Sequence, residues 1–288
     1  MTAHQTRRTF VTAGAALAAL PLLPPLRAFG QDQAQWPFFA FDNGVGRGKW
    51  PAEKQAATLK ALGYDGISYN YTDNKDLETW IRVYGEAKLK IFALYIHTFP
   101  EKNEAHWSPD LRDAIGLLKG SETVLWITFR EAKVKGDYDE ACVKIARDLG
   151  DLAQAAGLRV AIYHHAGFYV ATALDSQRIA RRAAHPAVGA SFNLCHEFMT
   201  GNGGKALETL RAVGPEASLV SINGVDPADK KRYILPLGQG SFDTAALLAE
   251  LKRLGYKGPV GHQFYSIPGE PEANLKAALA AWRKQQPV

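Results

Sequence analysis

The sequence contains few cysteines, and their placement suggests neither a disulfide bridge nor a zinc cluster. Only two occur in 288 residues, Cys142 in a predicted helix and Cys195 at the end of a predicted strand, and this spacing implies no bridge. Runs of basic residues, and basic residues interleaved with aromatic ones, are also missing, which argues against nucleic acid as a partner. What remains is an ordinary globular composition, with 47% hydrophobic and 22% charged residues.

Long hydrophobic runs are absent as well, apart from one short run near the N-terminus. The run VTAGAALAALPLL follows the paired Arg7 and Arg8 and leads to a small-x-small cleavage site, AFG, at residues 28–30. This pattern predicts a twin-arginine signal peptide over residues 1–30 and a periplasmic mature protein. A membrane anchor is the alternative, but the run is shorter than the ~20 residues that span a bilayer, and Pro21 interrupts it. We therefore expect no membrane span in the mature chain.

The charge of the chain depends on whether this segment is counted. The formal net charge is +5, and the predicted signal peptide contains Arg7, Arg8 and Arg27 but no acidic residue. The mature chain then has 31 basic and 29 acidic residues, a net charge of +2. The basicity of the sequence therefore belongs largely to the signal peptide.

From Trp36 onward, short apolar strands alternate with amphipathic helices. The predicted strands are FFAFDN, GISYNY, KIFALYIH, TVLWITFR, RVAIYHH, GASFNLCH, SLVSING and PVGHQFY. Alternation of this kind indicates parallel strands joined by helical crossovers. Eight such units in about 250 residues predict a single (β/α)8 TIM barrel over residues 36–288. A doubly wound open sheet is the alternative.

Successive residues of a strand face opposite sides, which sorts the side chains of each strand. We expect the large aliphatic sets, such as Phe92, Leu94 and Ile96, to pack under the helices, leaving the smaller or polar sets inside the barrel. The inward polar set gathers at the strand C-termini and comprises Asn70, His97, Arg130, Tyr163, His165, Asn193, Asn223 and Gln263. Barrel active sites lie at that face, and an unpartnered buried polar group costs about 1–3 kcal/mol. The set therefore predicts a functional site rather than a structural core.

The histidines allow two interpretations. His165 is either a packed, hydrogen-bonded side chain or a metal ligand or acid–base group. His196 lies just past Asn193 in a predicted loop, where functional residues are common. His164 and His262 are out of phase with the inward set, and we expect them to be structural.

The other polar residues also leave alternatives open. Neutral amides such as those of Asn193, Asn223 and Gln263 suit sugar hydroxyls better than a metal ion. Arg130 could hold an oxyanion or pair with Glu131. Aromatic side chains that could form either a sugar-stacking pocket or core are Tyr95, Trp126, Tyr163 and Phe168.

Several segments resemble the xylose isomerase-like sugar phosphate isomerase/epimerase superfamily of TIM barrels. They are GLRVAIYHHAGF, VGASFNLCH, LVSINGVD and LPLGQGSFDTAALLAELKRLGYKGPVGHQ. Members of that superfamily typically hold one divalent metal with Glu, Asp, His and Glu ligands from strands five to eight. The resemblance implies that the corresponding positions here are Tyr163, Asn193, Asn223 and Gln263. None keeps the typical ligand.

The departure from this quartet bears on the cofactor. Replacing carboxylates with amides removes most of the anionic charge that would hold Mn²⁺ or Mg²⁺. The resemblance also implies that the Asp-x-x-His element survives as Asn193-x-x-His196, with His196 as a substrate-contacting residue. A softer site for one divalent ion (zinc, cobalt or manganese) remains open, with candidate ligands His165, His196, Asn193 and Gln263.

The segments FNLCH, SINGVD and GPVGHQ resemble a subgroup that includes lyases and hydratases of 3-keto-glycosides. The leading hypothesis is therefore an exported enzyme that takes a carbohydrate and abstracts a proton next to its carbonyl group, as a 3-keto-glycoside lyase or hydratase. One alternative is a sugar isomerase or epimerase, and another is a carbohydrate-binding barrel without activity. We predict His165, His196 and Arg130 as catalytic residues. The predicted substrate-binding residues are Asn70, His97, Tyr163, Asn193, Asn223 and Gln263.

Overall fold

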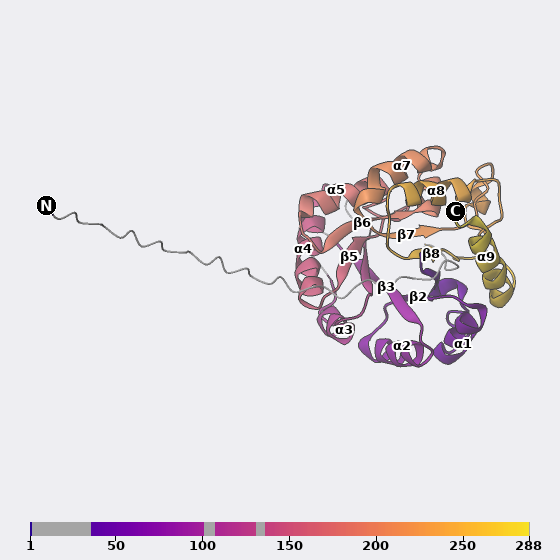
Figure 1. Cartoon of the computed structure of the whole chain (residues 1–288), viewed down its shortest axis with the longest axis horizontal. Helices are drawn as coiled ribbons and strands as arrows, with labels where there is room; N and C mark the ends of the chain where they lie inside the picture. The colour runs from indigo at the N-terminus through magenta and orange to yellow at the C-terminus, as the bar shows by residue number, and fades with distance from the viewer. Residues whose placement is uncertain (2–35, 101–106, 131–135, 288) are drawn as a thin grey trace. The chain divides into compact units, whose positions relative to one another are not determined.

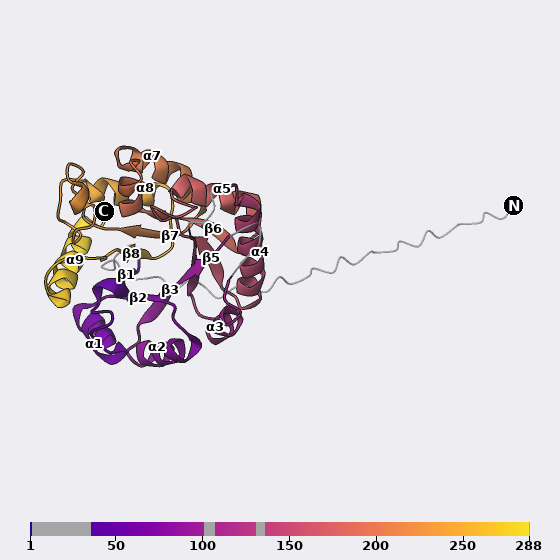
Figure 2. The same ribbon diagram turned by 180° about the vertical axis from the view of Figure 1, so that it is seen from behind.

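The computed structural model describes residue 1 and residues 36–100, 107–130 and 136–287, and within them the predicted (β/α)8 barrel is confirmed. Eight parallel strands pair in sequence order, and β8 pairs with β1 to close the sheet (Figures 1 and 2). This closure excludes the doubly wound open sheet. Beyond residue 1, the predicted signal peptide lies outside the described residues.

The strands are β1 (Phe38–Phe41), β2 (Gly66–Asn70), β3 (Lys90–Thr98), β4 (Val124–Phe129), β5 (Arg159–Ile162), β6 (Val188–Asn193), β7 (Ala217–Ile222) and β8 (Val260–His262). The helices are α1 (Ala52–Leu62), α2 (Asn74–Glu86), α3 (Leu111–Leu117), α4 (Asp139–Ala155), α5 (Ala173–Ala183), α6 (Leu194–Met199), α7 (Ala206–Val213), α8 (Thr244–Arg253) and α9 (Pro271–Gln285). Short 3-10 helices are η1 (Asp42–Gly44), η3 (Gly203–Lys205), η4 (Gly214–Glu216) and η5 (Lys230–Arg232).

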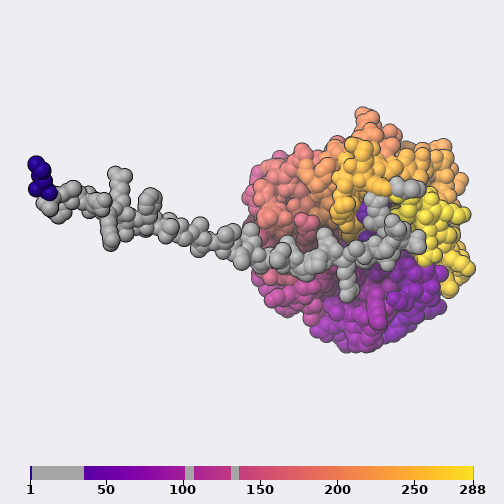
Figure 3. Space-filling view, viewed as in Figure 1, coloured from indigo at the N-terminus to yellow at the C-terminus, as the bar shows by residue number. Residues whose placement is uncertain are grey.

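Local sequence signals set the ends of the helices that return the chain to the sheet. Gly63 ends α1 in the left-handed conformation, at φ 94°, which glycine adopts without strain. Thr172 and Asp175 form a capping box at the start of α5, each side chain accepting the backbone N–H of the other. The first and last helices, α1 and α9, are in contact, and the purple N-terminal and yellow C-terminal parts of the barrel adjoin in the space-filling view (Figure 3). Within the described ranges, no helix is long and apolar enough to cross a membrane.

The inside of the barrel holds its own hydrophobic cluster. Its members are Phe39, Phe41, Phe92, Ala93, Val124, Trp126, Ala161, Tyr163 and Leu219. Trp126 and Tyr163 face inward as the alternation predicts, with ring centroids 4.4 Å apart in an edge-to-face arrangement. The expectation that Phe92 packs under the helices is wrong. The β2–β3 register shifts by one residue next to Phe92, and this irregularity turns its ring inside, 5.4 Å from that of Phe39.

Candidate active site

The hydroxyl of Tyr163 is the centre of a buried polar cluster at the C-terminal end of the barrel. Asn193 Nδ2 lies 2.7 Å from the phenol oxygen, His196 Nε2 lies 3.0 Å from it, and Gln263 Nε2 lies 3.4 Å from it. None of the four side chains belongs to a residue more than 5% exposed. We call Tyr163, Asn193, His196 and Gln263 the phenol cluster. The structure thus brings together three of the residues predicted from the strand ends and His196, which was predicted from the segment after the sixth strand.

The backbone explains why these side chains meet. Tyr163 and Gln263 each follow the last residue of a strand and extend its ladder, because their N–H groups bond to backbone oxygens of the preceding strands, β4 and β7. Asn193 ends β6, and His196 lies one turn later in α6. The loop expected at His196 is therefore a short helix, whose first turn places His196 and Asn193 beside the same hydroxyl.

The hydrogen bonds of the phenol cluster have two arrangements. In one, the amides of Asn193 and Gln263 fill both lone pairs of the phenol oxygen, so Tyr163 donates its proton to His196 Nε2. In the other, His196 donates its Nε2 proton to the phenol oxygen, which accepts Asn193 as its second donor in place of the longer Gln263 contact, and His196 Nδ1 accepts the Ala166 N–H at 3.4 Å. Burial raises the pKa of Tyr163 well above its usual value and lowers the pKa of His196 well below its own. Both groups are therefore neutral near pH 7.

His165 is half-buried next to this cluster, with its ring stacked on that of Phe168 and tilted by 43° to that of His196. Its centroid is 4.1 Å from the ring of Phe168 and 4.1 Å from that of His196. Nδ1 of His165 lies 2.8 Å from the backbone oxygen of Ala166, which can only accept, so the proton is on Nδ1 and Nε2 keeps its lone pair. Burial is the main cause that lowers the pKa of His165. This is the protonation state and tautomer of a general base.

Arg130 and His97 border the same rim. The Arg130 guanidinium is exposed and lies 4.7 Å from the centre of the Phe168 ring. His97 Nδ1 bonds to Thr128 Oγ1 at 2.9 Å, and burial, helped by Arg130, lowers the pKa of His97 to about 4. The neutral His97 ring and the cation of Arg130 thus flank Phe168. Glu131, the alternative partner of Arg130, lies outside the described residues.

Besides His97, two predicted substrate-binding residues lie outside the phenol cluster. The Asn223 side chain is fully buried, and its Nδ2 donates to the backbone oxygens of Gly224 at 2.6 Å and Tyr233 at 2.8 Å. It therefore fastens the segment that follows β7. Asn70 is half-buried at the end of β2, where its backbone N–H donates to Asp42 at 3.0 Å.

Residues directly after β1 belong to the site and were not predicted. Asn43 Nδ2 donates to Gln263 Oε1 at 3.0 Å, and the backbone N–H of Tyr265 donates to the same oxygen at 3.1 Å. These two bonds turn the Gln263 amide nitrogen toward the phenol cluster. Asp42 is buried beside Arg47, and burial raises the pKa of Asp42 to about 6. The signal for both residues is the polar pair that closes the apolar strand in FFAFDN.

Two further histidines lie behind the site, as the strand phase predicts. His164 is fully buried, with Nε2 3.3 Å from Glu197 Oε1, and Glu197 accepts the Ala173 N–H at the start of α5 at 2.8 Å. Burial lowers the pKa of His164 to about 4 and raises the pKa of Glu197 to about 7, so their contact near neutral pH is not a full ion pair. His262 Nε2 accepts the Leu237 N–H at 3.0 Å. These contacts join the end of β5 to α6, and β8 to the segment that follows η5.

The donor atoms of the phenol cluster do not fit a divalent metal ion. A metal binds oxygen or unprotonated nitrogen, but Asn193 and Gln263 both turn N–H groups toward Tyr163. Their oxygens are already engaged, Oδ1 of Asn193 by the Cys195 thiol at 3.0 Å and Oε1 of Gln263 by Asn43 at 3.0 Å. In the part of the chain that the structure describes, no group of three or more His, Cys, Asp or Glu side chains could hold a metal. The sequence left open a metal site with four candidate ligands, His165, His196, Asn193 and Gln263. The geometry of these residues does not support it.

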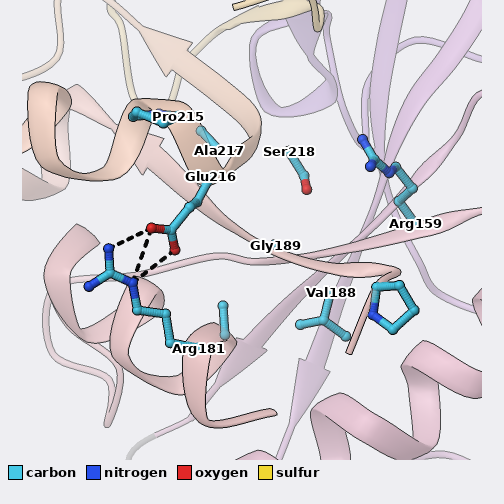
Figure 4. Close-up of a pocket in the computed structure, with 10 residues that line it drawn as sticks. Arg159, Arg181, Val188, Gly189, Pro215, Glu216, Ala217 and Ser218 are labelled. Atoms are coloured by element: carbon cyan, nitrogen blue, oxygen red, sulfur yellow. Dashed lines mark hydrogen bonds and ion pairs between the residues drawn. The ribbon is translucent and has the colours of Figure 1, made fainter. Parts of the chain in front are cut away.

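Two cavities lie at opposite ends of the barrel. One of about 260 Å³ adjoins the phenol cluster and is lined in part by Asn43, Arg47 and Trp50. Another, of about 270 Å³, lies at the first residues of β5, β6 and β7, where Arg181 is held by Glu216 (Figure 4). Because barrel enzymes bind substrate at the C-terminal face, the first cavity belongs with the candidate site.

Comparison with known proteins was made on sequence and on structure. A model of the xylose isomerase-like TIM barrel family matches residues 56–285. No protein of curated function matches the sequence significantly. The IOLI protein with a bound zinc atom superposes with a TM-score of 0.67 at 15% identity, over 86% of this chain and 97% of that one.

Two sugar epimerases have similar structures. The 3-keto-D-glucoside 4-epimerase from E. coli gives a TM-score of 0.66 at 14% identity, over 86% of this chain and 99% of that one. D-allulose 3-epimerase from Methylomonas sp., in complex with D-allulose, gives 0.69 at 17% identity, over 88% and 98%. At these identities the likeness establishes the shared fold.

Proposed function

Because this chain belongs to the xylose isomerase-like TIM barrel family, we propose that it is an enzyme that removes a proton from the carbon next to a carbonyl group of a sugar or oxidised sugar. The observation that carries the proposal is the state of His165. Its Nε2 is unprotonated and lies on a half-buried rim beside the cation of Arg130 and next to a cluster of neutral hydrogen-bond donors. A base next to groups that stabilise a developing oxyanion is what enolisation requires.

Within this class we favour a 3-keto-glycoside lyase or hydratase. His165 Nε2 takes the C2 proton, the C–H electron pair forms a C2–C3 double bond, and the C3 carbonyl becomes an enolate oxygen facing Arg130 or His97. When the ketone re-forms, the electron pair moves to C1–C2, and the aglycone leaves C1 with its bonding pair. The leaving oxygen takes a proton from the Tyr163–His196 pair. The hydratase direction adds water to the same C1–C2 double bond.

The cavity between the segments that follow β1 and β8 is linked to the phenol cluster through Asn43 and offers room for a group attached to the sugar. Its volume is about 260 Å³, and Asn43 connects its lining to Gln263. A group attached to the sugar has room there without displacing the buried residues. The neutral amides around it suit hydroxyl groups.

A second candidate is an epimerase that returns the proton to the opposite face of the same carbon. The sugar epimerases among the structurally similar proteins support it, one of them named for a 3-keto-D-glucoside substrate. The two candidates share the first step and differ in whether the C1 substituent is expelled.

Product NMR in D₂O distinguishes these possibilities on a panel of 3-keto-glucosides and free aldoses. Deuterium at C2 with release of the aglycone supports the lyase, and exchange without release supports the epimerase. His165→Ala should lower turnover by about 10²–10⁴-fold, the usual contribution of a general base. If His165→Ala and His196→Ala both turn over a confirmed substrate at the wild-type rate, the assignment is wrong. Sugar binding without turnover in the wild type would instead indicate a binding protein.

We also propose that the chain is exported, on the evidence of the paired Arg7 and Arg8 ahead of an apolar run. Changing both arginines to lysine should retain the protein in the cytoplasm with its N-terminal segment uncleaved. Cell fractionation and mass spectrometry of the intact protein measure this. Periplasmic recovery of the variant at the wild-type level would contradict twin-arginine export.

A further inference from the structure

We infer that the Tyr163 hydroxyl takes the place of a divalent metal ion in this barrel, so that the protein folds and binds its substrate without a metal. The positions that the family resemblance assigns to metal ligands are Tyr163, Asn193, Asn223 and Gln263. Three of these four converge on one point, and the atom at that point is the phenol oxygen.

The amide groups of the phenol cluster face its centre with the opposite atoms from those that a metal site requires. Around a cation, amide groups point their oxygens inward, whereas here Asn193 and Gln263 point their nitrogens toward Tyr163. The orientation is fixed from behind, because the Cys195 thiol donates to Asn193 Oδ1 and Asn43 donates to Gln263 Oε1. To bind a cation, both amides would have to rotate and lose these bonds in a buried environment, at a cost for each unpaired group.

The ring of Tyr163 is held as firmly as its hydroxyl. Trp126 contacts it edge-on with centroids 4.4 Å apart, and Tyr95 does so at 5.2 Å. The Tyr163 backbone N–H bonds to the oxygen of Ile127 in β4 at 2.7 Å. Since the side chain is fixed at both ends, its hydroxyl can join β5, β6 and β8 as a metal ion would, but without charge.

This arrangement narrows the substrate class, a step that rests on the proposed function. A metal ion can chelate two neighbouring sugar oxygens, whereas a phenol offers one hydrogen bond. Neutral donors with one arginine suit a substrate whose C–H bond is already acidified by a ketone. That favours oxidised sugars over free aldoses.

The first experiment measures metal on the full mature chain, purified without chelator. We expect substoichiometric Mn, Co and Zn by mass spectrometry, and an unfolding temperature that does not change on addition of EDTA. Calorimetric titration with Co²⁺ or Mn²⁺ should show no saturable site. One equivalent of tightly bound metal that is lost in His196→Ala would overturn the inference.

The second experiment converts the cluster. A variant with Tyr163→Glu, Asn193→Asp and Gln263→Glu places carboxylates around the point that the phenol occupies, and it should bind Mn²⁺ or Co²⁺ at one saturable site that the wild type lacks. The control is Glu78→Gln with Glu208→Gln, which changes exposed carboxylates elsewhere and should not alter metal affinity. A folded triple variant with wild-type metal affinity would show that the phenol does not occupy a metal position.

If the triple variant does not fold, the single variant Tyr163→Phe replaces it in the test. It removes only the hydroxyl, so we expect lower stability with metal affinity still at the wild-type level. Wild-type stability in Tyr163→Phe would show that the hydroxyl does not join the strands as a metal ion would, contrary to the inference. None of these measurements uses a sugar, so their failure would leave the proposed enzymatic function standing.

Discussion

The Tyr163 hydroxyl lies 3.0 Å from Nε2 of His196, and both residues are at least 97% buried. A phenol and an imidazole in contact without solvent can bond only to each other and to the amides around them. Removing one partner therefore leaves the other unpaired. This interdependence makes the phenol cluster a structural element, and the mechanism that we propose adds a proton donated from it to the leaving group.

Tyr163→Phe should lower the free energy of unfolding by about 1–3 kcal/mol, because up to three buried N–H or ring nitrogen groups lose their shared partner. Urea denaturation measures the change. The control is Tyr265→Phe, at a residue 61% exposed, where we expect a change within about 0.5 kcal/mol. Equal stability of the two variants would mean that the hydroxyl is not a required partner.

Arg130→Gln should move the acidic limb of the pH–rate profile to higher pH. A general base works when unprotonated, and burial together with Arg130 lowers the pKa of His165, so wild-type kcat/KM should remain high below pH 6.5. Removing the arginine raises the pKa of His165 again. The measurement is kcat/KM against pH on a confirmed substrate. Arg253→Gln, on α8, serves as the charge control, and an unshifted limb in Arg130→Gln would show that another group titrates.

His262→Gln should make the protein less sensitive to acid. Burial lowers the pKa of His262 from 6.5 to about 3, so between these pH values the unfolded state takes up a proton that the folded state does not. Wild-type stability is therefore lost as the pH falls, at up to about 1.4 kcal/mol per pH unit from this residue. The difference between the unfolding free energies at about pH 6 and about pH 5 should be smaller in the variant than in the wild type. Identical slopes would refute the assignment of a neutral buried imidazole.

Asn43→Ala should lower turnover more than it lowers the stability of the protein. Gln263 Oε1 keeps the Tyr265 N–H but loses the Asn43 donor, which costs about 0.5–1.5 kcal/mol and loosens the amide that faces Tyr163. Turnover and unfolding free energy are both measured. Gln154→Ala is the control, since it removes an exposed amide side chain on α4. Equal effects of the two changes on turnover would remove Asn43 from the site.

The alternation of strands and helices determined the barrel, because eight apolar runs separated by amphipathic helices have few other ways to bury both faces of a parallel sheet. Strand phase likewise placed Tyr163, Asn193 and Gln263 at one end of the barrel, since side chains at the carboxyl ends of parallel strands share a rim. It failed at Phe92, where a register shift between β2 and β3 reverses the phase. A bulge depends on how a strand pairs with its neighbour, so the hydrophobic pattern of the bulged strand alone does not reveal it.

Only the tertiary structure decided which way the amides face. A sequence shows that Asn193 and Gln263 stand at former ligand positions, but either end of an amide can point inward. The choice was made by Cys195 and Asn43, donors that bind the amide oxygens from behind. Asn43 and Gln263 lie 220 residues apart and meet only through folding, whereas Cys195 is two residues from Asn193 and is placed by the turn into α6. The physical reason is that a buried amide orients to satisfy all its neighbours at once, and the sequence alone does not specify those neighbours.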